Sequence, residues 1–312
     1  MQTEYRYITE SLAINDYGSG DRELVSVNDG PGELDELFQR VGFYSASHDF
    51  RELCGFIRRF PKIGPYNALL LHIQRPGCTF VATAKEWKTD FNRTVKPGAR
   101  PLVILRPFGP VNFVFDLQDT DGTDPFPEDL LEPFKIHDRS REAECRYALD
   151  RLLNAVPADG IAFYPSDFST AAAGYIETAG IGSWQKFRGH QLKVHYNLVV
   201  SRNLPPVEMF ASVLHELGHL YCGHLGTVDK RAWPDRKHIT DAGIKEFEAE
   251  CVSWIVCSRM GIDSESEKYL ADYLDQNSRI PDISLEVILK AAGMIETRIK
   301  KGIPVPKSLK IS

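Results

Sequence analysis

The sequence of 312 residues contains no long uninterrupted apolar run. Its first twenty residues mix charges with isolated apolar side chains, unlike the apolar centre of a secretory signal. No later stretch reaches the roughly 20 apolar residues that a membrane-spanning helix needs. We therefore expect a cytoplasmic protein without a membrane partner.

Cysteine is scarce and widely spaced, and no CxxC pair occurs. A disulfide framework needs a denser set of cysteines, and a zinc ribbon needs CxxC pairs. Both classes are therefore disfavoured. We expect most of the six cysteines to be reduced thiols, namely Cys54, Cys78, Cys145, Cys222, Cys251 and Cys257.

Acidic residues are few between Arg51 and Arg106, where eleven lysines and arginines stand against three acids, although the whole chain has a net charge of -6. A cationic segment within an acidic protein favours a surface for a polyanion, because cations that neutralise phosphates release counterions. The same charges also suit a solvated helical face, so charge alone leaves both interpretations open.

The residue pattern indicates an α+β protein of two domains. Residues 1–130 would form a small domain with helices near 33–44, 47–60, 65–75 and 83–91 and a β-hairpin across Gly109 and Pro110. The segment 119–133 is rich in Asp, Pro and Gly and is the candidate linker. Residues 131–312 would form the second domain, with a helix over 141–156, strands near 161–165, 174–180 and 192–201, and helices to the end.

The motif His215-Glu216-Leu217-Gly218-His219 carries the clearest chemistry. On a helix, residues four apart lie on one face, so His215 and His219 can bind one zinc ion while Glu216 faces a water molecule. Glu216 would act as the general base of peptide hydrolysis. The alternative is a pair of core histidines, which the apolar stripe leading into the motif makes less favoured. We expect one zinc ion per chain.

A catalytic zinc needs a third protein ligand. The metzincin pattern is disfavoured, because Leu225 stands where its third histidine would be and His224 comes one position early. On the next helical segment Glu248 falls within the apolar stripe, and a buried carboxylate without a partner is costly. We therefore predict Glu248 as the third ligand, with Glu250 as the reserve, and expect Glu246 to be a solvated surface acid.

The chain resembles two known families. HELGH, the strand KVHYNLVVS before it and EAE on the following helix resemble the ImmA/IrrE-type metallopeptidases, zincin-like enzymes of the gluzincin type, in which the glutamate before alanine is the third ligand. That resemblance also implies Glu248. Residues around YNALLLHIQRPGCTFVATAKEW resemble the N-terminal single-stranded-DNA-binding domain of ArdC-type antirestriction proteins.

These resemblances imply a zinc endopeptidase that cleaves a transcriptional repressor and is regulated by single-stranded DNA, as in phage defence or the DNA damage response. The competing function is an antirestriction-like DNA-binding protein whose zinc site is structural or vestigial. A structural site needs no general base, so the presence of Glu216 favours the peptidase.

The basic segment interleaves cations with Tyr66, Phe80, Trp87 and Phe91, as a groove for single-stranded nucleic acid would. The aromatic spacing equally suits the core of a small domain. The candidate DNA contacts are Arg59, Lys62, Arg75, Lys85, Trp87, Lys88, Arg93, Lys96 and Arg100.

Cys78 follows Pro76 and Gly77 and is therefore expected on a loop. A thiolate on a mobile loop can bind zinc as a regulatory fourth ligand, to be withdrawn when DNA binds nearby. The alternatives are an inert thiol at Cys78 or a contact from Cys251. Tyr175, Tyr196 and Tyr221 are the nearby candidates for stabilising an oxyanion.

Overall fold

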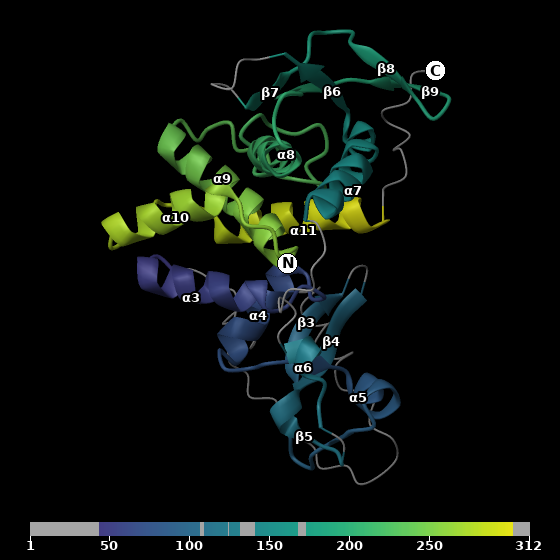
Figure 1. Cartoon of the computed structure of the whole chain (residues 1–312), viewed down its shortest axis with the longest axis vertical. Coiled ribbons are helices and arrows are strands. Elements are labelled where there is room, and N and C mark those ends of the chain that lie inside the picture. The colour runs from purple at the N-terminus through teal and green to yellow at the C-terminus, as the bar shows by residue number, and fades with distance from the viewer. Residues whose placement is uncertain (1–43, 107–108, 124, 132–140, 168–172, 302–312) are drawn as a thin grey trace, which may run out of the picture.

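The computed structural model describes residues 44–106, 109–123, 125–131, 141–167 and 173–301 (Figure 1). The helix expected near 33–44 lies almost wholly outside these residues. Within the described parts of the chain, no helix is long and apolar enough to cross a membrane.

The C-terminal part begins with α7 (Arg141–Leu153) and the short helix η3 (Val156–Asp159), followed by a sheet of β6 (Ile161–Ser166), β7 (Gly174–Thr178) and β10 (Tyr196–Ser201). In this sheet β10 is central, parallel to β6 and antiparallel to β7, so β7 is an edge strand. The hairpin of β8 (Trp184–Phe187) and β9 (His190–Lys193) extends beyond the sheet.

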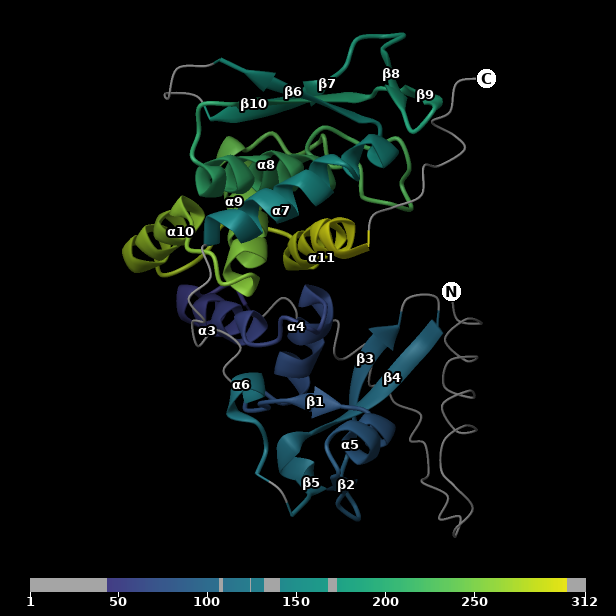
Figure 2. The ribbon, with the colours of Figure 1, turned by 45° about the vertical axis from the view of Figure 1, so that its right-hand side comes forward.

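Helices cover one face of this sheet (Figure 2). Next to it lie α7 and α8 (Pro206–Tyr221), then α9 (Ala242–Arg259), α10 (Glu265–Gln276) and α11 (Leu285–Lys301). The helices expected for 141–156 and for the HELGH segment are confirmed, as are the strands expected near 161–165 and 174–180.

The N-terminal part places α3 (Ser47–Arg58) and α4 (Pro65–Gln74) against the C-terminal helices, with β1 (Val81–Ala82), β3 (Leu102–Arg106) and β4 (Gly109–Asp116) beyond them (Figure 2). The order of this second sheet is β1-β4-β3, and β3 and β4 form the expected antiparallel hairpin. Around the sheet lie α5 (Ala84–Asp90), β2 (Thr94–Val95), η2 (Leu117–Asp119), β5 (Thr120–Asp121) and α6 (Glu128–Leu131).

The main hydrophobic core runs through both parts. Phe50 and Leu53 of α3 belong to the same buried cluster as Phe247 of α9 and Leu289 of α11. Arg259, at the end of α9, donates hydrogen bonds to the carbonyl oxygens of residues 57, 60, 61 and 63 in and after α3. The fold is thus mixed α+β, with a β-rich N-terminal region and a helical C-terminal region, and the domain division near residue 130 stays a prediction.

Candidate metal centre

The HELGH motif lies in the second half of α8. Proline at the first turn starts the helix, and the fully buried side chains of Phe210, Val213, Leu214 and Leu217 fix the face that packs into the core. His215 and His219 lie to one side of that face and remain partly exposed. Their Nε2 atoms are 3.1 Å apart, so both imidazoles point toward the same place.

Helix α9 crosses α8 at Gly218 and Ala249. A Cβ atom on Gly218 would lie 3.0 Å from the Cα atom and 3.1 Å from the carbonyl oxygen of Ala249, so a side chain here would require the two helices to move apart by a few tenths of an ångström. The close crossing brings the acidic residues of α9 to the imidazoles of α8.

Glu246 is the acid that meets both histidines. Its Oε2 atom lies 3.3 Å from Nε2 of His215, and its Oε1 atom lies 3.4 Å from Nε2 of His219. Ligand atoms from the three residues all lie within 4.8 Å of one another, so the group could hold a metal ion. Two imidazole nitrogens and one carboxylate are the donor set of a His2Glu catalytic zinc site, which leaves a fourth position for water or substrate.

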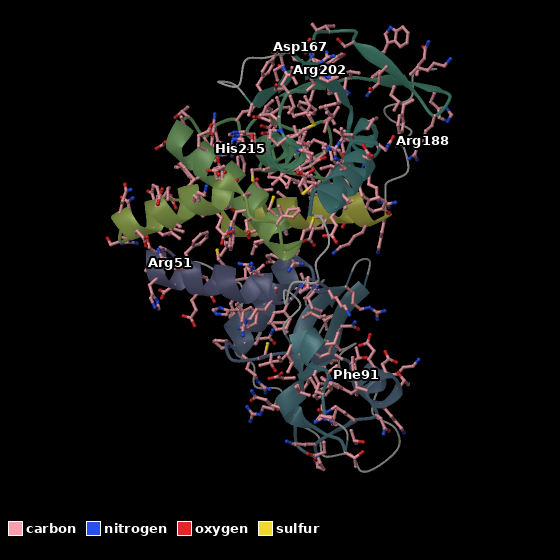
Figure 3. The ribbon with its side chains drawn as sticks, in the orientation of Figure 1. Arg51, Phe91, Asp167, Arg188, Arg202 and His215 are labelled. Atoms are coloured by element: carbon pink, nitrogen blue, oxygen red, sulfur yellow. The ribbon has the colours of Figure 1, made fainter. Side chains whose placement is uncertain are left out.

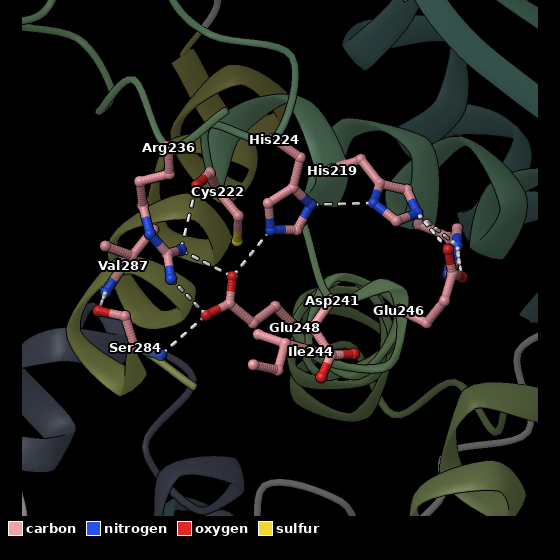
Figure 4. A network of polar contacts seen from close by, with 11 residues as sticks. His219, Cys222, His224, Arg236, Asp241, Ile244, Glu246, Glu248, Ser284 and Val287 are labelled. Atoms are coloured by element: carbon pink, nitrogen blue, oxygen red, sulfur yellow. Dashed lines mark hydrogen bonds and ion pairs between the residues drawn. The ribbon is translucent and has the colours of Figure 1, made fainter. Parts of the chain in front are cut away.

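The structure places Glu246 beside the two histidines, whereas Glu248, the predicted third ligand, lies elsewhere. Glu248 is fully buried as expected, but it lies on another side of α9. Its two oxygens accept hydrogen bonds from the guanidinium of Arg236 at 2.7 and 2.8 Å, and Ser284 N and a ring nitrogen of His224 lie 2.8 Å away (Figure 4). The cost of burial is therefore offset by a cation and further donors, without a metal.

Glu250, the predicted reserve ligand, contacts His215 alone of the two histidines. Its Oε1 atom lies 3.3 Å from Nδ1 of His215, the ring nitrogen that faces away from the Glu246 contact. A carboxylate in this position fixes the orientation and tautomer of a metal-binding histidine. Glu246 and Glu250 are four residues apart and so share the face of α9 that meets α8.

The charged side chains of His215, Glu246 and Glu250 shift one another's pKa values. Burial lowers the pKa of His215, but hydrogen bonds with Glu246 and Glu250 raise it more, to about 10. The hydrogen bonds from His215 and His219 hold the pKa of Glu246 well below its usual range. Without a metal, the site therefore contains a cationic imidazole between two carboxylates.

Glu216 stands next to the metal-binding group on α8 and is not part of it. Burial raises the pKa of its carboxyl, whereas the neighbouring imidazoles of His215 and His219 lower it. The carboxyl also accepts a hydrogen bond from the backbone N–H of Ile176 on the edge strand β7. A raised pKa and a place beside the metal ligands suit a general base.

A second group that could hold a metal contains Cys222, His224 and Glu248. All three are buried, but Arg236 already binds both oxygens of Glu248. Burial raises the pKa of the Cys222 thiol well above its usual value. We therefore assign this group a role other than metal binding.

The structure places Cys78 in the main core rather than at the metal centre. The residue follows α4, its side chain is fully buried, and burial raises the pKa of its thiol to about 12. The structure does not bring Cys78 to the candidate metal group, and its burial in the main core favours the interpretation as an inert thiol. Cys251 is also fully buried and its pKa is raised well above the usual value.

Two of the three tyrosine candidates are engaged elsewhere. The hydroxyl of Tyr196 donates to the carbonyl of Gly226, and the hydroxyl of Tyr221 donates to Asp159. Only Tyr175, on the edge strand β7, is exposed.

The predicted DNA contacts divide into three groups. Trp87 is fully buried and donates from its indole to the carbonyl of Phe115, within a core of Phe80, Phe91 and Phe126, so the aromatic residues pack as a small core. Three cations make contacts within the N-terminal part: Arg75 with Asp119, Arg93 with Thr120 and Lys96 with Asp121. The remaining candidates are exposed: Arg59, Lys62, Lys85, Lys88 and Arg100.

Figure 3 shows His215 among the helices of the C-terminal part. Comparison with solved structures finds a likeness to the antirestriction protein ArdC of plasmid R388. The metal-free ArdC structure is 14% identical with a TM-score of 0.35, over 77% of this chain and 86% of that chain. The Mn(II)-bound ArdC structure is also 14% identical, with a TM-score of 0.32, over 76% of this chain and 89% of that chain. At these values the likeness carries no argument about function. No protein-family model and no curated protein matches the chain.

Proposed function

We propose that the protein is a zinc-dependent peptidase whose metal ligands are His215, His219 and Glu246, one zinc per chain. The observation that carries the proposal is the convergence of two Nε2 atoms and one carboxylate beside a separate acid, Glu216. Zinc held by this donor set would supply Lewis acidity toward a scissile carbonyl and toward a water molecule. Glu216 would accept the proton of that water and deliver it to the leaving amine.

The edge strand β7 supports a polypeptide substrate. Among the described residues it pairs with β10 alone, and the N–H of Ile176 on its other side reaches Glu216. An extended peptide can add to such an edge by main-chain hydrogen bonds. The scissile bond would then lie beside the general base, which favours cleavage in an extended segment of a protein over cleavage in a compact folded surface.

The test compares wild type with Glu216→Gln on an unfolded protein such as casein, with zinc content measured on the same samples. We expect Glu216→Gln to keep its zinc and to lose at least about 100-fold in hydrolysis, within the range for general acid–base catalysis. Glu208→Gln, an exposed acid on the same helix, is the matched control and should keep full activity. Zinc binding without hydrolysis in the wild type would favour the structural or vestigial site instead.

The resemblance to ImmA/IrrE-type and ArdC-type proteins supports a finer proposal: the substrate is a DNA-binding repressor, and single-stranded DNA regulates its cleavage. Because the aromatic residues are packed in the core, we propose that DNA binds through exposed cations such as Lys85 and Lys88 of α5. Lys85→Glu with Lys88→Glu should weaken binding and lower its salt dependence. Unchanged DNA affinity in this variant would remove α5 from the interface.

A further inference from the structure

His219 contacts His224, a residue just beyond the end of the helix that carries His219. After α8 ends at Tyr221, Gly223 adopts a φ of 85° and turns the chain back. Gly223 N donates to the carbonyl of Leu220 at 2.9 Å, and His224 N donates to that of His219 at 3.0 Å, which is the pairing of a Schellman motif. The turn places the ring of His224 beside that of His219, with the two Nδ1 atoms 3.0 Å apart.

Metal binding through Nε2 determines where the hydrogens lie along this contact. A neutral His219 that binds metal through Nε2 carries its hydrogen on Nδ1, so Nδ1 of His224 must accept. The hydrogen of a neutral His224 is then on Nε2, which faces Oε2 of Glu248 at 2.8 Å (Figure 4). Every donor in the series of hydrogen bonds from His219 through His224 to Glu248 therefore meets an acceptor.

Glu248 is held as an acceptor by groups from two further segments. Arg236 binds both of its oxygens from the loop between α8 and α9, and Ser284 N donates to Oε1 from the start of α11. Arg236 is itself fixed, because its backbone N–H donates to the carbonyl of Gly223 and its guanidinium to that of Cys222. The carboxylate has 0% exposure and cannot exchange these partners for water.

We propose that His224, Glu248 and Arg236 form a positioning relay that fixes the tautomer and ring orientation of His219 for metal binding. The two metal-binding histidines would then be supported differently. His215 has a carboxylate, Glu250, directly on Nδ1, whereas His219 has a neutral imidazole between its Nδ1 and a carboxylate. The inference rests on the proposed metal centre, and it gives buried Glu248 a role in the metal site without making it a ligand.

The first test is zinc affinity, measured by chelator competition on purified full-length protein. His224→Phe removes the acceptor for His219, and we expect a loss of about 10–100-fold, the usual effect of losing a residue that supports a metal ligand. His224→Asn, whose Oδ1 takes the place of Nδ1, should recover part of that affinity. His72→Phe is the matched control, because His72 is also buried and paired through Nδ1, with the hydroxyl of Tyr44 in another part of the fold.

Zinc affinity within twofold of wild type in folded His224→Phe would overturn the relay, whereas a wild type that binds no zinc would overturn the metal centre itself. The second test needs no variant, so it also applies if His224→Phe does not fold. Ring ¹⁵N NMR of the zinc-loaded wild type should show hydrogen on Nδ1 of His219 and on Nε2 of His224. Hydrogen on Nδ1 of His224 would contradict the relay.

Discussion

The Cα atom of Ala249 lies 3.0 Å from the place where a Cβ atom on Gly218 would be. The obstacle is backbone, so neither residue can yield by changing a rotamer. This contact sets the distance between α8 and α9, and with it the distance from the imidazoles of α8 to Glu246 and Glu250. The geometry of the candidate metal centre therefore depends on a glycine that has no side chain with which to contact the proposed ligands.

Gly218→Ala should weaken zinc binding as well as stability, because the added methyl forces α8 and α9 apart. The expected loss of stability is about 1–3 kcal/mol, as for overpacking in a core. Zinc affinity by chelator competition and thermal unfolding would measure the two effects. Gly293→Ala on α11 is the control: its Cβ would meet Pro65 at an ordinary 3.6 Å, so it should be neutral or stabilising. Equal effects of the two variants would contradict the role of the crossing.

The histidine part of the site could be predicted from the sequence because it is local. Residues four apart share a helical face whatever the tertiary fold, so His215 and His219 needed only a helix. The third ligand could not be predicted in this way. Successive residues turn by about 100° around a helix, so Glu246 and Glu248 point in very different directions, and the rotation of α9 against α8 decides which one reaches the histidines.

The burial of Glu248 is confirmed, but the structure pairs its carboxylate with Arg236 and not with the two histidines of α8. A metal is one of the few partners that can offset a buried carboxylate, but here Arg236, in the loop before α9, supplies the positive charge. Nothing in the local pattern around Arg236 indicates that pairing, because the loop brings it back only in the folded chain. Similarly, the spacing of Phe80, Trp87 and Phe91 could not distinguish a stacking surface from the small core that they form.

Glu246→Ala should lower zinc affinity by more than about 100-fold, beyond the effect of losing a residue that only supports a ligand. Glu250→Gln should cost about 10–100-fold, because His215 loses its orienting carboxylate but no ligand is lost. Glu265→Gln, an exposed acid on α10, serves as the control. A larger loss in Glu250→Gln than in Glu246→Ala would exchange the two roles.

Zinc binding should release a proton at neutral pH. In the metal-free protein the pKa of His215 is raised to about 10, so the ring is protonated at pH 7, and zinc needs the neutral imidazole. Affinity should therefore rise about tenfold per pH unit from pH 7 toward 10. Calorimetry in buffers of different ionisation enthalpy would count the released protons, and zero net release at pH 7 would contradict the raised pKa.

The raised pKa of His215 also makes the stability of the metal-free protein depend on pH. The stability changes with pH in the opposite direction to the zinc affinity. A histidine whose pKa is higher in the folded state stabilises the fold fully below its ordinary value of 6.5. That contribution is lost as pH rises toward about 10. Urea unfolding of the metal-free protein should therefore show stability falling between pH 7 and 10, the range in which zinc affinity rises.

Arg259 connects the helix that carries Glu246 to the N-terminal part of the chain. Its side chain is 1% exposed, pairs with Glu296 of α11 at 2.6 Å, and donates to carbonyls at the end of α3 and in the loop after it. Arg259→Met leaves the carboxylate of Glu296 buried with Lys300 at 3.5 Å as its remaining ion-pair partner among the described residues, together with several carbonyls that lose their donor. We expect a loss of about 3–5 kcal/mol in the free energy of unfolding, as for other broken buried pairs.

Urea unfolding followed by circular dichroism would measure this loss, and Arg259→Met combined with Glu296→Met should recover part of it, because the uncompensated charge is then removed. Arg51→Met is the matched control: Arg51 also forms a 2.6 Å pair, with Asp275, but both side chains are more than half exposed, so the cost should stay below about 1 kcal/mol. Because one core joins α3 to α9 and α11, the wild type should unfold in a single transition. Two separate transitions, with Arg259→Met shifting only one of them, would instead support independent domains on either side of residue 130.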